Sequence, residues 1–85
     1  MIEFCYTVQD PVGIHARPAG MLAKAAKAFD CEVIISKGEK RADATRLMAV
    51  MGLCVKGGDT VCVSVSGKDE IRAAEELKRF FEETL

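Results

Sequence analysis

The sequence predicts an α+β fold, an open-faced sandwich in which three helices cover one face of an antiparallel sheet. Four short segments alternate apolar and polar residues, which is typical of strands with one buried face. Two other segments repeat apolar residues at helical spacing, so each is expected to bury one side. A third, residues 45–53, is nearly all apolar after Arg46 and is expected to be a short helix. The elements follow one another as strand, helix, strand, strand, helix, strand, helix. Because every strand alternates, the two faces of the sheet must differ, as in an antiparallel sheet covered on one side.

The four strands are expected at residues 2–8, 32–36, 41–44 and 60–66. The side chains that should face the helices are Ile2, Phe4, Tyr6, Val8, Val33, Ile35, Ala42, Ala44, Val61, Val63 and Val65. Arg41 and Asp43 would point the other way, and charged side chains suit a strand at the edge of a sheet. Pro11 and Gly13 break the chain after the first strand, so a loop should lead to the first helix.

The three helices are expected at residues 18–29, 45–53 and 70–85. The first should bury Ala19, Leu22, Ala23, Ala26 and Phe29, and the last should bury Ile71, Ala74, Leu77, Phe81 and Leu85. We expect Thr45 to cap the middle helix, while Asp69 and Glu70 suit the positive end of the last one. The middle helix is too short to bury all its apolar side chains.

Composition narrows the class of protein. The 85 residues are expected to form a single domain, and 49% apolar content argues against disorder. A formal net charge of −1 argues against a nucleic-acid partner. The first residues show no leader pattern, and no apolar run approaches the roughly 20 residues that cross a bilayer. We therefore expect a cytoplasmic protein with no membrane insertion.

Four cysteines, Cys5, Cys31, Cys54 and Cys62, have no spacing typical of a zinc site, and only one histidine is available to join them. We therefore expect no metal and no cofactor. A cytosolic chain keeps its thiols reduced, so all four are expected to be free and to act as small apolar fillers.

The segment from Gly13 to Gly20 contains the only histidine, His15, with Arg17 two positions on and Pro18 after it. Proline is well tolerated in the first turn of a helix, so His15 should lie at or just before a helix N-terminus. Free amides and the helix dipole make that position an anion site, and phosphate is the usual anion. The guanidinium of Arg17 can donate two hydrogen bonds at once to two oxygens of a phosphate. A neutral imidazole, such as that of His15, is a nucleophile. The pattern favours a histidine that carries a phosphoryl group, although a lone histidine there is often only a cap or surface residue.

The run Gly13-Ile14-His15-Ala16-Arg17-Pro18-Ala19 resembles the active-site motif of HPr, the histidine-containing phosphocarrier family of the bacterial sugar phosphotransferase system. The resemblance extends to chain length and to residues 47–53. It implies that His15, through Nδ1, accepts a phosphoryl group from enzyme I, which draws on phosphoenolpyruvate, and passes it to IIA domains of sugar-specific enzymes II. The backbone amides of Ala16 and Arg17 would hold the phosphate, and His15 with Arg17 would be the catalytic residues.

The resemblance also implies the strand order 1-4-2-3. That order would place Cys5 and Cys62 next to each other on the uncovered face, where a disulfide is a lower-ranked alternative to free thiols. It further implies a partner-docking surface, for which the candidates are Gly20, Met21, Lys24, Leu47, Met48 and Met51. Arg46 occupies the position of the family's regulatory serine, with Thr45 one position before it, so we expect no regulatory phosphorylation.

Two alternatives remain. One is a carrier in a nitrogen-related or dihydroxyacetone-kinase phosphorelay, which uses the same chemistry with other partners. The other is a regulatory docking module of the same fold that does not use His15. In the favoured interpretation the chain is a monomer and a stoichiometric phosphoryl-transfer protein rather than a stand-alone enzyme.

Overall fold

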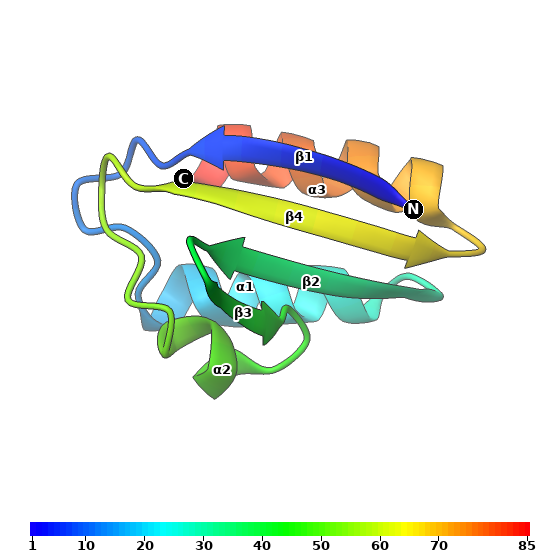
Figure 1. Ribbon diagram of the computed structural model, residues 1–85, viewed down its shortest axis with the longest axis horizontal. Helices are drawn as coiled ribbons and strands as arrows, with labels where there is room; N and C mark the ends of the chain where they lie inside the picture. The colour runs from blue at the N-terminus through cyan, green and yellow to red at the C-terminus, as the bar shows by residue number, and fades with distance from the viewer.

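One four-stranded antiparallel sheet forms the frame of the protein in a computed structural model that describes residues 1–85 (Figure 1). The strands are β1 (Ile2–Thr7), β2 (Cys31–Lys37), β3 (Lys40–Asp43) and β4 (Thr60–Gly67). They lie in the order β1-β4-β2-β3, so β1 and β3 are the edge strands. The predicted strand order is confirmed.

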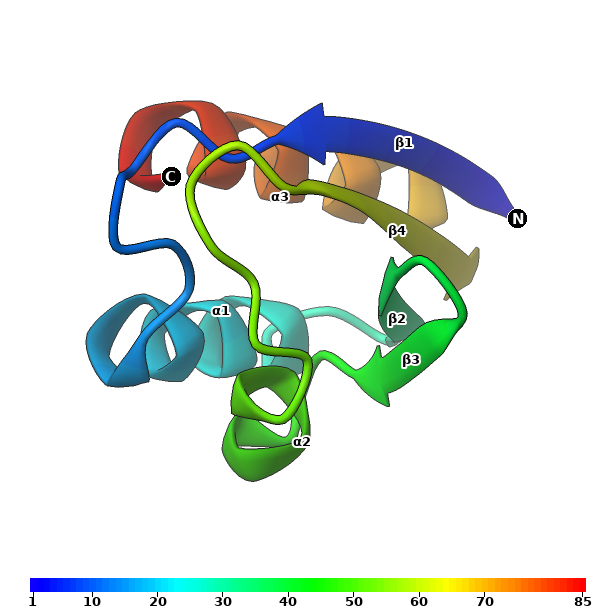
Figure 2. The ribbon, with the colours of Figure 1, turned by 60° about the vertical axis from the view of Figure 1, so that its left-hand side comes forward.

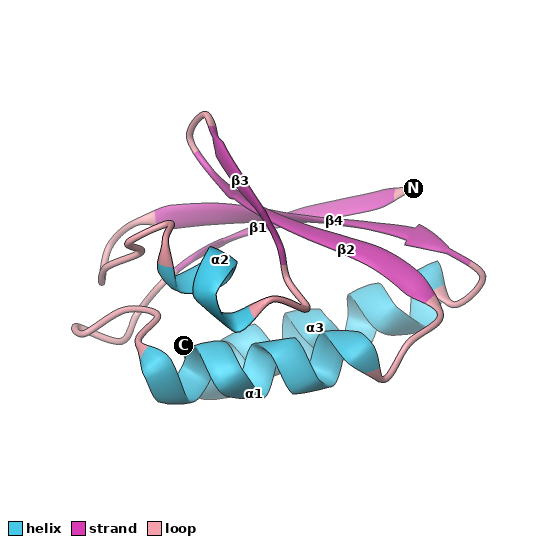
Figure 3. Cartoon of the chain, turned by 90° about the horizontal axis from the view of Figure 1, so that it is seen from below, coloured by secondary structure: helices cyan, strands magenta, loops and turns pink.

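The helices α1 (Ala16–Lys27), α2 (Leu47–Met51) and α3 (Glu70–Thr84) all lie on one side of the sheet (Figure 3). Helix α1 packs against α3, and the short α2 packs against α1 and β3. The other face of the sheet carries no helix. The predicted open-faced sandwich is therefore confirmed.

The core lies between the sheet and the helices. Val33, Val61, Val63 and Val65 point toward the helices from the two central strands and are almost completely buried. From α3 the ring of Phe81 packs edge-on against those of Phe4, Tyr6 and Phe80. Alternation along β4 puts valines inside and Cys62, Ser64 and Ser66 outside, as the sequence predicted.

Three expectations about the helices were wrong. Helix α1 ends at Lys27, so Phe29 lies beyond the helix and is half-buried rather than part of its buried stripe.

The other two concern α3 and α2. Ile71 is 67% exposed, and Ala73 is buried in the inner face of α3 instead. At 3.6 residues per turn Ile71 lies about 120° around the helix from Leu77, outside the buried stripe. Thr45 does not cap α2, because its hydroxyl donates to the Asp43 carboxylate at 2.6 Å, and Arg46 takes the N-cap position.

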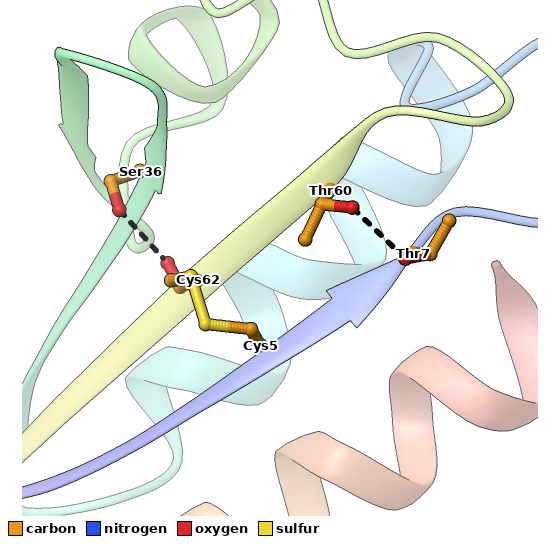
Figure 4. Close-up of a disulfide and its surroundings, with 5 residues drawn as sticks. All are labelled: Cys5, Thr7, Ser36, Thr60 and Cys62. Atoms are coloured by element: carbon orange, nitrogen blue, oxygen red, sulfur yellow. Dashed lines mark hydrogen bonds between the residues drawn. A yellow bond between two sulfur atoms is a disulfide. The ribbon is translucent and has the colours of Figure 1, made fainter.

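The expectation of four free cysteines was also wrong. Cys5 and Cys62 lie directly opposite each other in the β1–β4 register and form a disulfide, with Cα atoms 4.0 Å apart (Figure 4). The expectation rested on the reducing compartment, whereas the antiparallel register decides which sulfur atoms lie within bonding distance. Cys31 and Cys54 are free. No helix in the structure has the length and apolar character that a bilayer crossing requires.

Candidate functional site

His15 lies where the loop after β1 enters α1, and it occupies the N-cap position of that helix. Its backbone is extended, with φ −105° and ψ −171°, and its side chain makes no capping hydrogen bond. The residue is exposed to solvent. The imidazole is therefore free to react with a group that approaches from outside, as the sequence predicted for its position.

The first turn of α1 leaves two backbone donors beside His15. The first hydrogen bond inside the helix runs from the Ala19 amide to the His15 carbonyl oxygen at 2.9 Å. The amides of Ala16 and Arg17 precede it and have no carbonyl within the helix to bind, while Pro18 has no amide hydrogen. The first turn contains no acidic side chain. Two unpaired donors and the positive end of the helix dipole therefore face solvent at this end.

The Arg17 side chain adds a positive charge next to these amides. Arg17 is exposed, and the two salt bridges of the structure involve other groups, namely the amino group of Met1 with Glu70 and Lys37 with Asp59. The guanidinium therefore has no carboxylate to neutralise it. Because it carries several donors in one plane, it suits an anion with more than one oxygen, such as a phosphoryl group.

A glycine fixes the loop that delivers His15. Gly13 has φ +79°, a conformation that side-chain-bearing residues rarely adopt, and a Cβ at this position would overlap the carbonyl oxygen of Val55. The next amide, that of Ile14, donates to the same Val55 oxygen at 3.0 Å. Gly13 thus allows the backbone before His15 to lie directly on the loop between α2 and β4.

That second loop is itself held in place by hydrogen bonds, and the two loops run side by side (Figure 2). The Asp59 carboxylate accepts from the Lys56 amide at 2.9 Å, and the Lys37 ammonium lies 3.2 Å from Asp59 and 2.9 Å from the Cys54 carbonyl oxygen. The Lys56 amide, and after it Lys37, holds the pKa of Asp59 below its ordinary value of 3.8. Gly57 packs against the first loop, since a Cβ there would lie 2.7 Å from the Asp10 carbonyl oxygen.

Sequence reasoning did not find this supporting role of residues 54–59. Gly57 and Gly58 form a Gly-Gly pair, which is common in loops and does not indicate which backbone segment lies close to it. The close approaches of Gly57 to Asp10 and of Gly13 to Val55 join loops more than 40 positions apart, and no local sequence pattern contains them.

The candidate docking residues are distributed over α1 and α2, and Figures 1 and 3 place α2 beside the N-terminal half of α1. Met48 is 76% exposed, Met21 45% and Leu47 39%. Lys24 is exposed and Gly20 is partly exposed. Met51 is half-buried and packs against the core, so less of its side chain is open to a partner than that of Met48.

The turn before α2 is held by hydrogen bonds to the Asp43 carboxylate. Asp43 accepts the Thr45 hydroxyl at 2.6 Å and the Thr45 amide at 2.9 Å. The hydroxyl, and then the amide, lowers the pKa of Asp43. The Thr45 hydroxyl is therefore already engaged, and Arg46 is exposed beside it.

Comparison with known proteins gives consistent results. The family model described as "PTS HPr component phosphorylation site" matches residues 2–83. The "Phosphocarrier protein HPr" of Mycoplasma capricolum subsp. capricolum is 34% identical over 79 residues, which cover 93% of this chain and 89% of the relative. The protein of the same name from Lysinibacillus sphaericus is 42% identical over 72 residues, which cover 85% and 82%.

Solved structures agree with the sequence relatives. The crystal structure of HPr-C-His from Thermoanaerobacter tengcongensis superposes with a TM-score of 0.91 at 32% identity, covering 96% of this chain and 92% of that one. The histidine-containing phosphocarrier protein of a mycoplasma superposes with a TM-score of 0.94 at 32% identity, covering 98% and 94%.

Proposed function

This chain belongs to the HPr phosphocarrier family, and from that membership we propose that His15 accepts a phosphoryl group from enzyme I and donates it to IIA domains of sugar-specific enzymes II. The observation that carries the proposal is the exposed His15 at the start of α1, next to two unpaired amides and an unpaired arginine. We place the protein, with these partners, in the cytoplasm.

The proposed reaction moves one phosphoryl group between two imidazoles. Neutral His15, through Nδ1 as in the family, attacks the phosphorus held by the donor histidine, and the donor N–P bond breaks as the new one forms. Negative charge then gathers at the N-terminus of α1, where the Ala16 and Arg17 amides and the Arg17 guanidinium stabilise it. The helix itself need not rearrange, because the Ala16 and Arg17 amides already lie in its first turn without an internal partner.

Exposure of the site suits a carrier. A phosphoryl group that must pass from one protein to another has to be reached by both, and a shallow site at a helix end allows each partner to approach in line. Weak contact with the phosphate is also an advantage, because the same group has to leave in the next step. The donor protein and the acceptor protein therefore both reach the phosphoryl group at the same exposed position, the N-terminus of α1.

We propose that partners dock on the surface formed by Gly20, Met21, Lys24, Leu47 and Met48, which we call the docking surface. Its methionines are flexible and adapt to more than one partner. Met51, which is half-buried and packs against the core, adds a smaller exposed area to the same surface. Fast exchange between partners requires a small, weak interface, so we propose that the chain acts as a monomer.

The test is an intact-mass measurement after incubation with enzyme I, magnesium and phosphoenolpyruvate. Wild-type protein should gain the mass of one phosphoryl group, and the modification should be lost in acid, as expected of phosphohistidine. His15→Ala should gain nothing, while Lys27→Ala, an exposed residue on the same helix, should gain the group like wild type. Absence of any gain with a competent enzyme I would contradict the proposal.

A further inference from the structure

The disulfide between Cys5 and Cys62 lies on the face of the sheet that no helix covers (Figures 3 and 4). Cys5 belongs to the edge strand β1 and is exposed, and Cys62 belongs to the neighbouring strand β4 and is half-exposed. Both side chains point away from the core, because Phe4, Tyr6, Val61 and Val63 on either side of them point into it. Solvent therefore reaches the pair from the open side of the sheet.

The two cross-strand pairs that flank the disulfide on this face, Thr7–Thr60 and Glu3–Ser64, are polar. Thr7 and Thr60, the next pair on the same face, join their hydroxyls at 2.9 Å. On the other side of β4 the Ser36 hydroxyl donates to the Cys62 carbonyl oxygen at 3.3 Å (Figure 4). The threonine and serine side chains are too small to cover the sulfur atoms. A thiolate in solution can therefore reach the pair, and access is one of the factors that set the rate of thiol–disulfide exchange.

We propose that Cys5 and Cys62 form a reversible thiol–disulfide exchange site, which a dithiol reductant opens and a small-molecule disulfide closes while the protein stays folded. Structural disulfides resist reduction, whereas exposed ones are the labile ones. The two free cysteines do not serve as internal exchange partners. Cys31 packs against the core at the start of β2, opposite Gly67, and Cys54 lies in the loop after α2.

The opening reaction begins at Cys5, whose sulfur is on the more exposed residue and on the edge strand. A thiolate of the reductant attacks Cys5 Sγ, the Cys5–Cys62 bond breaks, and Cys62 Sγ leaves with the electron pair and takes up a proton. The second thiol of the reductant then attacks its own sulfur in the mixed disulfide, which releases Cys5 as a thiol and the reductant as a cyclic disulfide. Two electrons and two protons are transferred in total. In closure, the Cys5 thiolate attacks oxidised glutathione and releases one glutathione thiol, and Cys62 Sγ then attacks Cys5 Sγ in the mixed disulfide and releases the second; two glutathione thiols open the bond by the reverse of these two steps.

Reduction should leave the fold intact, because β1 has other contacts. Its backbone ladder to β4 covers six residue pairs, and Phe4 and Tyr6 pack on Phe81. What reduction removes is a constraint on the unfolded chain, in which the bond joins residues 57 positions apart. The reduced protein should therefore unfold at a melting temperature that is lower by on the order of 10–20 °C.

The experiment titrates the native protein with glutathione buffers of defined ratio, quenches each sample in acid, and counts alkylated thiols by mass after denaturation. The oxidised form should show two reactive thiols and the reduced form four, with a single transition that is the same from both directions. Circular dichroism of the reduced form should remain that of a folded protein. If the bond opens only after denaturant is added, or if reduced protein does not re-form it, the proposal is wrong.

Serine variants identify the cysteines involved. Cys5→Ser should abolish the transition and should melt like reduced wild type, whereas Cys54→Ser should keep the transition with one thiol fewer in each state. If Cys5→Ser does not fold, the melting curve of reduced wild type supplies the same comparison. A disulfide-linked dimer on a non-reducing gel, in place of the intramolecular pair, would overturn the proposal.

Discussion

His15 has two properties that a group carrier needs, an exposed reactive ring and neighbouring donors with no internal partner. Neither property depends on a deep pocket. The residue is positioned by its backbone, since the loop that contains Gly13 lies on Val55 and the His15 carbonyl begins the hydrogen bonds of α1. A change at the ring should therefore alter the chemistry and leave the stability nearly unchanged.

Replacing Arg17 should separate charge stabilisation from folding. Arg17→Ala should slow phosphoryl transfer from enzyme I by about 10- to 100-fold, because one or two charge-assisted hydrogen bonds to the phosphoryl oxygens are lost. Lys27→Ala is the matched control, a cation removed from the other end of the same helix. Rapid-quench kinetics give the rates. Equal rates for the two variants would show that Arg17 does not contact the phosphoryl group.

Replacing Gly13 should damage the site through its backbone. Gly13→Ala should destabilise the protein by at least about 2 kcal/mol, because a positive φ and an overlap with Val55 both oppose a side chain there. Gly20→Ala is the control, since no atom lies within 4 Å of its added Cβ. It should stabilise the protein by about 0.5–1 kcal/mol, as alanine does inside a helix. Urea denaturation measures both, and a Gly13→Ala protein as stable as wild type would contradict the close contact between the loops.

At the scale of elements, alternation and helical spacing predicted the four strands and the two long helices, because each has one face in the core. The short α2 was predicted from its apolar run instead. The errors arose where a residue has a choice that periodicity does not decide. Ile71 lies at the border of the apolar stripe of α3 and is exposed. Thr45 donates its hydroxyl to Asp43 instead of capping α2, and Cys5 bonds to Cys62 on the neighbouring strand. The position of His15 and the first turn of α1 were predictable because Pro18 and the motif around it are neighbours in the sequence. The loop that holds His15 also packs on residues 54–59, and this contact between loops distant in sequence was not predictable.

The docking surface on α1 and α2 gives a prediction for binding. Met48→Asp should weaken binding to enzyme I by about 10-fold, because it places a charge where an exposed apolar side chain meets the partner. Ile71→Asp is the control, a similarly exposed apolar residue at the start of α3, toward the opposite end of the molecule (Figure 1). Isothermal titration calorimetry measures both affinities. If Ile71→Asp weakens binding as much as Met48→Asp, the docking surface is misplaced.

At the scale of the whole molecule, two carboxylates join segments that are distant in sequence, and a third closes a local turn. Asp59 binds Lys37, Glu70 binds the amino group of Met1 and the Gly67 amide, and Asp43 closes the turn before α2. Each has a lowered pKa, for which the leading causes are a hydrogen bond from the Lys56 amide, from the Met1 amino group and from the Thr45 hydroxyl respectively. These groups bind more protons in the unfolded chain than in the folded one at mildly acidic pH.

The protein should therefore lose stability in acid. The contribution of these carboxylates is fully present above their ordinary pKa values, about 4, and is lost as the pH falls through the lowered ones. Urea denaturation at pH 5 and at pH 2.5 should give a lower free energy of unfolding at pH 2.5. Asp59→Asn should show a smaller difference between the two pH values, since one of the titrating groups is gone. Identical pH dependence in the variant would exclude Asp59 as a contributor.

The central claim is that the phosphoryl group on His15 is held by the first turn of α1, and a two-dimensional amide NMR spectrum before and after phosphorylation tests it most directly. The account predicts that the amide protons of Ala16 and Arg17 move most, toward lower field, because they become donors to phosphoryl oxygens. His15→Ala should show no such change. The account is contradicted if these two amides stay in place, or if the largest changes surround another phosphorylated residue such as Thr45.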